Sequence, residues 1–140
     1  TKAKRLLDKA LYLSNGFEDD YVKSDIYFSL GKFYIKSKTP DKAIDYIHRS
    51  LNIVEDSTQK YELYKMLGEA YWDINQSDSA TLYLNKSLKN PDLFVRIESY
   101  RLLKQIAISN KELSESYLIN ERIIACNDSL QAYNHSNKII

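Results

Sequence analysis

Two short segments of this chain repeat at a constant spacing. The segment Leu30–Tyr34 (LGKFY) recurs as Leu67–Tyr71 (LGEAY), which places their two glycines 37 residues apart. The alanines that follow these segments, Ala43 and Ala80, are also 37 residues apart. A period between about 20 and 50 residues marks units that cannot bury their apolar face alone and must stack on neighbours. The sequence therefore predicts a repeat protein.

Each repeat starts with a helical pattern. Apolar or small residues recur at i, i+3, i+4 and i+7 in both units: Tyr27, Leu30, Gly31 and Tyr34, then Tyr64, Leu67, Gly68 and Tyr71. Glycine costs about 1 kcal/mol of helix propensity relative to alanine. Its recurrence in the middle of the stripe indicates that another helix approaches closely at Gly31 and Gly68.

A second helix follows in each unit. Thr39-Pro40-Asp41 predicts its start in the first unit, because threonine can cap, proline suits the first helical position and aspartate meets the positive end of the helix dipole. Ser77-Asp78 marks the matching start in the next unit. The packing faces that follow contain Ala43, Ile44, Ile47 and Leu51, and then Ala80, Leu84 and Leu88. Each unit is thus predicted to be a hairpin of two helices.

The same signals divide the chain, which we expect to be a single domain. A lone second helix, a half repeat, is expected to end in a left-handed cap at Asn15-Gly16. Asn90-Pro91-Asp92 opens a degenerate third unit, in which Lys104 replaces the glycine and Ser116 the alanine. The predicted units are the half repeat 1–16, the repeats 19–54 and 56–90, the degenerate repeat 90–126, and a C-terminal extension of the last helix, 127–140.

Composition agrees with one helical domain. The chain has 140 residues, of which 44% are hydrophobic. Its three glycines and two prolines are few, which favours long helices joined by short loops over many strands and turns. Its formal net charge of +1 points neither to nucleic acid nor to a membrane surface. No apolar run approaches the roughly 20 residues that span a bilayer. Because Thr1 is not an initiator methionine, we expect the chain to be a piece of a longer protein.

The repeated residues resemble the tetratricopeptide repeat family, whose pattern is an aromatic residue, Leu-Gly and Tyr in the first helix, then Ala in the second. This pattern is present in Tyr27-Leu30-Gly31-Tyr34-Ala43 and in Tyr64-Leu67-Gly68-Tyr71-Ala80. The family period is about 34 residues, so the first helices here are expected to be longer by about one turn. The resemblance implies an all-α superhelix, a solenoid of antiparallel helix hairpins with a concave groove lined by the first helices. It also implies a non-enzymatic module that binds proteins or peptides.

The side chains one residue beyond the packing stripe are expected to line that groove. They are Phe28, Lys32 and Ile35, then Lys65, Glu69 and Trp72, then Arg101, Gln105 and Ile108. Apolar residues at positions expected to face solvent are typical of a surface that receives a peptide or a partner helix. The alternative is that the same residues contact the next helix pair. Trp72 is the main anchor candidate, because tryptophan is enriched in binding hot spots.

The C-terminal stretch carries a second pattern. Ile119, Ile123, Cys126, Leu130 and Tyr133 follow the 4-3-4-3 spacing of a coiled-coil seam. This helix either caps the last repeat or forms a homodimer. The segment Ile124–Gln131 also resembles the exit helix of tetratricopeptide sensor proteins of some Gram-negative bacteria. That resemblance implies the alternative function, a repeat segment of a larger membrane-linked regulatory protein, periplasmic or cytoplasmic, that signals through its C-terminal helix.

Chemistry-bearing motifs are absent from the sequence. Neither histidine, His48 or His135, accompanies a nucleophile motif, and no phosphate-binding glycine loop or metal-binding motif is present. The single cysteine, Cys126, excludes an internal disulfide and cannot build a metal site alone. We therefore expect no catalytic residues, no metal and no cofactor. Nucleic acid is not the expected partner either, because acidic Glu69, Asp73 and Glu98 near the groove would repel phosphate.

Overall fold

The computed structural model of this chain describes residues 1–16 and 19–138, which form seven α-helices and no strand. The helices are α1 (Lys2–Ser14), α2 (Asp20–Lys36), α3 (Pro40–Leu51), α4 (Ser57–Asp73), α5 (Ser77–Ser87), α6 (Leu93–Ser109) and α7 (Leu113–Lys138). The predicted all-α class is therefore confirmed. Residues 139 and 140, the end of the predicted extension 127–140, lie outside the described residues.

Aspartate side chains start the three long first helices. The Oδ1 atoms of Asp19, Asp56 and Asp92 accept hydrogen bonds from backbone N–H groups two or three residues on, at 2.9, 2.7 and 2.8 Å. The predicted cap at Thr39 is wrong in its mechanism. Thr39 precedes α3, but its side chain makes no capping bond and its Oγ1 instead donates to the Tyr34 carbonyl oxygen at 3.4 Å.

Left-handed residues end the first helices at three equivalent positions. Lys38, Asn75 and Lys111 have φ values of 54°, 61° and 61°, and they lie 37 and 36 residues apart. The cap predicted at Asn15-Gly16 is wrong, since Asn15 has φ −63° and no glycine has a positive φ in the described part of the chain. Helix α1 ends with right-handed geometry because the N–H of Asn15 still bonds the Leu11 carbonyl, at 3.2 Å.

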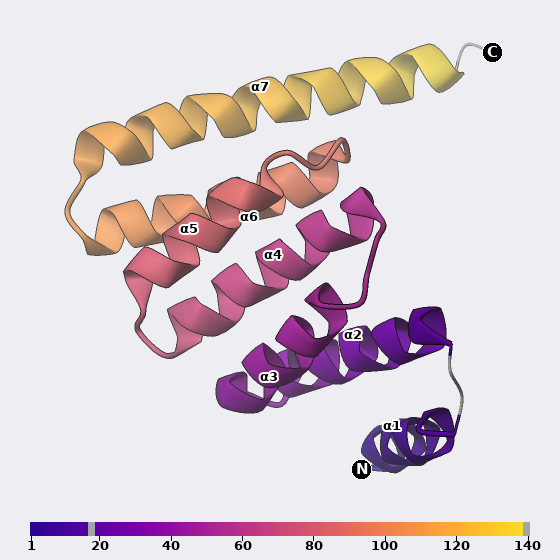
Figure 1. Cartoon of the computed structure of the whole chain (residues 1–140). Helices are drawn as coiled ribbons and strands as arrows, with labels where there is room; N and C mark the ends of the chain where they lie inside the picture. The colour runs from indigo at the N-terminus through magenta and orange to yellow at the C-terminus, as the bar shows by residue number, and fades with distance from the viewer. Residues whose placement is uncertain (17–18, 139–140) are drawn as a thin grey trace.

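The helices stack in chain order, with α1 and α7 at opposite ends of the stack (Figure 1). Three hairpins form, α2 with α3, α4 with α5 and α6 with α7, and each second helix packs on the next first helix. The first helices contact one another, α2 with α4 and α4 with α6. Within the described residues, by contrast, no Cα atoms of α3 and α5, or of α5 and α7, come within 8 Å. The first helices therefore form an inner layer, and the second helices diverge on the outer side.

Glycine allows the two helices of a hairpin to approach closely. A Cβ atom at Gly31 would lie 2.7 Å from Cγ1 of Ile47, and one at Gly68 would lie 2.5 Å from Cγ of Leu84. Real Cβ atoms do not come so close to another carbon, so the close crossing predicted from the sequence is confirmed at both positions. The third hairpin uses a polar contact instead, in which Lys104 Nζ donates to Asn120 Oδ1 at 2.7 Å.

Tyrosine rings fill the space between the helices of the first two hairpins. Tyr34 stacks on Tyr46 with ring centroids 5.6 Å apart, and Tyr71 stacks on Tyr83 at 5.5 Å. The two pairs occupy equivalent positions, 37 residues apart. An aromatic pair contributes about 0.5–1.5 kcal/mol beyond the area it buries. This recurring pair accounts for part of the high tyrosine content of the chain, 12 residues in all.

The last helix, α7, covers the third hairpin. Ile119 and Cys126 are buried in the core between α6 and α7, and Ile123 and Leu130 pack at its edge. Four of the five predicted seam residues are thus used within the chain, and only Tyr133 is exposed, at 64%. The expected coiled-coil seam is consequently not available as a free surface along Ile119–Leu130, because α6 already occupies it.

Candidate functional site

The inner layer carries the nine residues that were expected to line a groove, three on each of α2, α4 and α6. Their exposure differs. Four are half-buried (Phe28, Lys65, Glu69 and Trp72), four are exposed (Lys32, Arg101, Gln105 and Ile108), and one, Ile35, is buried. On α2, the Lys32 ammonium lies 5.1 Å from the centroid of the Phe28 ring. This is a cation–π contact. The two residues therefore form one amphipathic element of the inner surface.

One register position of the inner layer differs in exposure from hairpin to hairpin. Ile35, Trp72 and Ile108 are equivalent, but Ile35 is 8% exposed, Trp72 is half-buried and Ile108 is 51% exposed. Ile35 is therefore a core residue, contrary to the expectation that it lines the groove. The reason is stacking: α4 packs against α2, whereas no described helix follows α6 in the inner layer to cover Ile108.

A polar ladder joins successive first helices across the inner layer. Gln59 Nε2 donates to Asp25 Oδ1 at 3.2 Å, Lys32 lies 3.9 Å from Glu62, and Lys65 lies 2.5 Å from Glu98. The acceptors Asp25, Glu62 and Glu98 are 37 and 36 residues apart, the period of the repeats. This acidic series was not among the predicted site residues, although its repeat spacing is the signal that identifies it.

A small pocket lies on this surface between α4 and α6. It has a volume of about 220 Å³ and is lined by Lys65, Glu69, Glu98, Arg101 and Leu102. Three of the nine expected site residues are thus brought together. The Lys65 ammonium is engaged by Glu98, whereas neither Glu69 nor Arg101 forms an ion pair within residues 1–16 and 19–138. The Glu69 carboxyl group and the Arg101 guanidinium group are therefore the groups in this pocket that a ligand could pair with.

Burial raises the pKa of the Glu69 carboxyl above its ordinary value of 4.5, the nearby ammonium of Lys65 opposes the rise, and the Asp73 carboxylate adds to it. Lys38, which pairs with Asp73 at 3.1 Å, also opposes it but does not cancel the effect of burial. The charged form of Glu69 is consequently disfavoured in the folded protein. A cation brought by a partner would favour that form again.

No group of three or more His, Cys, Asp or Glu side chains is placed to hold a metal ion within the described ranges.

A bilayer crossing requires a helix of about 20 largely apolar residues. None of the helices α1 to α7 meets that requirement of length and apolar character.

A change of Glu69 to glutamine should stabilise the chain in a pH-dependent manner. Because the folded state raises this pKa, the folded protein binds more protons just above pH 4.5, and the free energy of unfolding falls as the pH rises through that window. Glutamine mimics the protonated form. We expect the Tm of Glu69→Gln, followed by circular dichroism, to exceed that of the unchanged protein at pH 7, and the difference to shrink at pH 4.

The control for this experiment is Glu121→Gln, which changes an exposed glutamate of α7. That variant should give the same difference in Tm at both pH values. A Glu69→Gln protein that melts below the unchanged protein at pH 7 would contradict an unfavourable charge at this position.

The comparisons with known proteins agree with the geometry of the hairpins. The family model described as tetratricopeptide repeat matches residues 24–54, which cover most of α2 and all of α3, and residues 61–90, which cover most of α4 and all of α5. Neither the curated proteins nor the solved structures gave a significant match. Tetratricopeptide repeats generally mediate contacts between proteins and are typically non-enzymatic. The two matched segments, which fold as stacked helical hairpins, are therefore tetratricopeptide repeats.

Proposed function

We propose that this chain is a non-enzymatic binding module whose inner layer receives an extended segment or a helix of a partner protein. The observation that carries the proposal is the pocket between α4 and α6, where Glu69 and Arg101, which form no ion pair with any described residue, lie beside Lys65 and its partner Glu98. A segment that bears both an acidic and a basic side chain would satisfy both groups.

Apolar side chains on the same layer supply anchor points. Phe28 and Trp72 are half-buried and Ile108 is exposed, one on each first helix. Aromatic residues surrounded by polar groups carry most of the energy of many protein interfaces. A helix or extended segment laid across α2, α4 and α6 would contact these three residues in turn. The alternation of acidic and basic groups across the layer supports a protein partner over a nucleic acid.

A photo-crosslinking amino acid at exposed Gln105 tests this proposal. Expressed in the source cells, the labelled chain should cross-link to a discrete protein, identified by mass spectrometry. Adding Arg101→Glu should reduce the yield at least fivefold, because the partner's carboxylate would then meet a like charge. The exposed position of Arg101 and its lack of an ion pair among the described residues predict that the fold survives this change.

The matched control reverses an exposed positive charge outside the inner layer, Lys89→Glu, in the loop after α5. Its yield should equal that of the labelled chain without further change. An unaltered cross-link in the Arg101→Glu protein, or no cross-linked protein at all, would refute binding at this surface.

A second candidate function rests on α7. This helix exposes Leu113, Tyr117 and Ile124 by 73, 65 and 47%, spaced four and seven residues apart on one side of the helix. Such a stripe is typical of a helix that packs against another helix. In this alternative, α7 pairs with a second copy, and the chain is a segment of a larger membrane-linked regulatory protein that signals through that pairing.

Sedimentation velocity tests this second candidate. If α7 dimerises, Tyr117→Asp combined with Ile124→Asp should convert a dimer to a monomer, since buried carboxylates at the seam are costly. The control is Tyr12→Asp, which changes an even more exposed tyrosine on α1 and should leave the mass unchanged. If the chain without substitutions sediments as a monomer at high concentration, dimerisation through α7 is excluded.

A further inference from the structure

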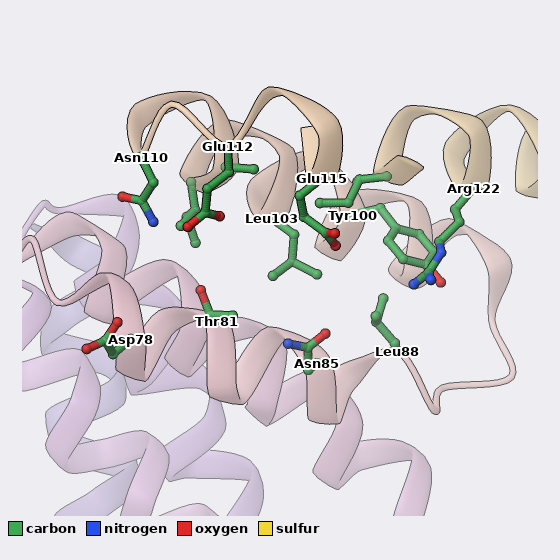
Figure 2. A pocket seen from close by; sticks show the side chains of 13 residues that line it. Asp78, Thr81, Asn85, Leu88, Tyr100, Leu103, Asn110, Glu112, Glu115 and Arg122 are labelled. Carbon is green, nitrogen blue, oxygen red and sulfur yellow. The ribbon is translucent and has the colours of Figure 1, made fainter. Parts of the chain in front are cut away.

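A larger pocket opens on the outer side of the stack, between α5 and α7. Its volume is about 290 Å³. Figure 2 shows side chains facing each other across it, Thr81 and Asn85 from α5, and opposite them Glu112, which directly precedes α7, and Glu115 in the first turn of α7. Helix α6 supplies a floor of buried side chains that includes Tyr100, Leu103, Ile106 and Ala107. This pocket is separate from the inner layer proposed above as the partner surface.

The corresponding space in the preceding hairpin is filled by rings. There, Tyr71 and Tyr83 stack nearly parallel, with an angle of 3° between their planes. His48 of α3 meets the Tyr83 ring edge-on at 6.1 Å, and its Nε2 lies 3.5 Å from the Tyr71 hydroxyl. These three side chains bridge α3 and α5, whose backbones do not touch. The gap between diverging outer helices is therefore closed at this junction.

Smaller residues occupy the same positions one repeat later. The period of 37 or 36 residues relates Ile44 to Thr81, His48 to Asn85, Tyr71 to Ala107 and Tyr83 to Ile119. All four later residues line the pocket. The pocket thus exists because the junction of the second and third hairpins lacks the side chains that fill the junction of the first and second hairpins. Two of the missing side chains are tyrosines.

The free volume matches what is missing. A cavity of about 150 Å³ in a protein core is large enough to hold one benzene molecule. The pocket, at about 290 Å³, has room for one or two aromatic rings. Its floor is apolar, as a ring requires, since Leu103, Ile106 and Ala107 are at most 7% exposed.

Two of the carboxylates at the rim are also specific to this junction. Glu112 and Glu115 stand where the preceding hairpin has Gln76 and Ser79, and Asp78 adds a third carboxylate. Arg122 stands where Lys86 lies 5.2 Å from the Tyr83 ring centroid, so a ring in the pocket would again have a cation beside it. Three carboxylates against one guanidinium leave the mouth of the pocket negative.

We propose that this outer pocket binds an aromatic side chain of a partner protein that is followed by a basic residue. The ring takes the place of the missing tyrosine stack on the floor formed by Ala107 and Ile119. The adjacent ammonium or guanidinium group meets the carboxylates of Glu112 and Glu115. The site is thus a second recognition point, on the opposite side of the stack from the inner layer.

Amide chemical shifts measured with three short peptides test the proposal. Acetyl-Tyr-Lys-amide should shift the amide signals of Ala107 and Ile119 in a saturable manner at millimolar concentration. Acetyl-Tyr-Glu-amide should bind at least fivefold more weakly, because its carboxylate faces three others. Acetyl-Ala-Lys-amide should give no saturable shift. Equal behaviour of the three peptides would overturn the proposal.

Filling the pocket provides the decisive variant. Ala107→Tyr restores the residue of the preceding hairpin, and it should raise the Kd for acetyl-Tyr-Lys-amide at least tenfold while raising the Tm. Thr81→Ile, which restores Ile44, is the milder variant, to be used if Ala107→Tyr does not fold, and it should raise the Kd at least threefold. Arg101→Glu, in the inner layer, should leave the Kd unchanged, which separates this site from the proposed function.

Two results would overturn the assignment. One is binding of acetyl-Tyr-Lys-amide that persists unchanged in a folded filled variant. The other is a concentration-dependent shift of Ala107 and Ile119 without any peptide, because a second copy of the chain would then occupy the pocket.

Discussion

The close crossing of the two helices in a hairpin is the constraint on which the rest of the structure depends. At Gly31 and Gly68 a side chain of the partner helix occupies the space where a Cβ atom would lie. This contact allows each first helix to bury its stripe against Ala43 or Ala80. Two glycines that cost helix propensity thereby position four helices. The third hairpin replaces this contact by the hydrogen bond of Lys104 to Asn120.

Stacking such hairpins creates two unlike surfaces. The first helices touch one another and share a polar ladder, whereas the second helices diverge and leave a gap between them. That gap must be filled by side chains, by water or by a ligand, since empty apolar space forfeits packing energy. His48, Tyr71 and Tyr83 fill it at one junction. At the next junction the smaller residues leave it open, and the two proposed recognition sites follow from this difference between the layers.

Much of the fold was readable from the sequence, because spacing and residue size carry it. The repeat of Gly31 at Gly68 predicted the close crossing, and Thr39-Pro40-Asp41 and Ser77-Asp78 predicted the starts of the second helices. The left-handed ends at Lys38 and Lys111 were not readable, since lysine is not a residue that favours positive φ. Gly16 is the opposite case: glycine favours a left-handed cap, but Gly16 does not adopt a positive φ.

The residues of the candidate site were harder to predict from the sequence, because the exposure of a side chain depends on which helices pack beside it. Ile35 and Ile108 share one register position, yet stacking buries the first and leaves the second exposed. The acidic series Asp25, Glu62 and Glu98 had the repeat period, but its role appears only when successive helices lie side by side. The outer pocket required knowledge of where Tyr71 and Tyr83 meet before their replacement by Ala107 and Ile119 acquired a meaning.

A double-mutant cycle between Gly68 and Leu84 tests the close crossing most directly. The free energy of unfolding would be measured by denaturant titration for Gly68→Ala, Leu84→Ala and the combination. Gly68→Ala alone should destabilise the chain, because its Cβ would meet Cγ of Leu84. In the Leu84→Ala background that carbon is absent, so the same change should become neutral or stabilising, a coupling of about 1 kcal/mol or more. Equal effects of Gly68→Ala in both backgrounds would contradict the account.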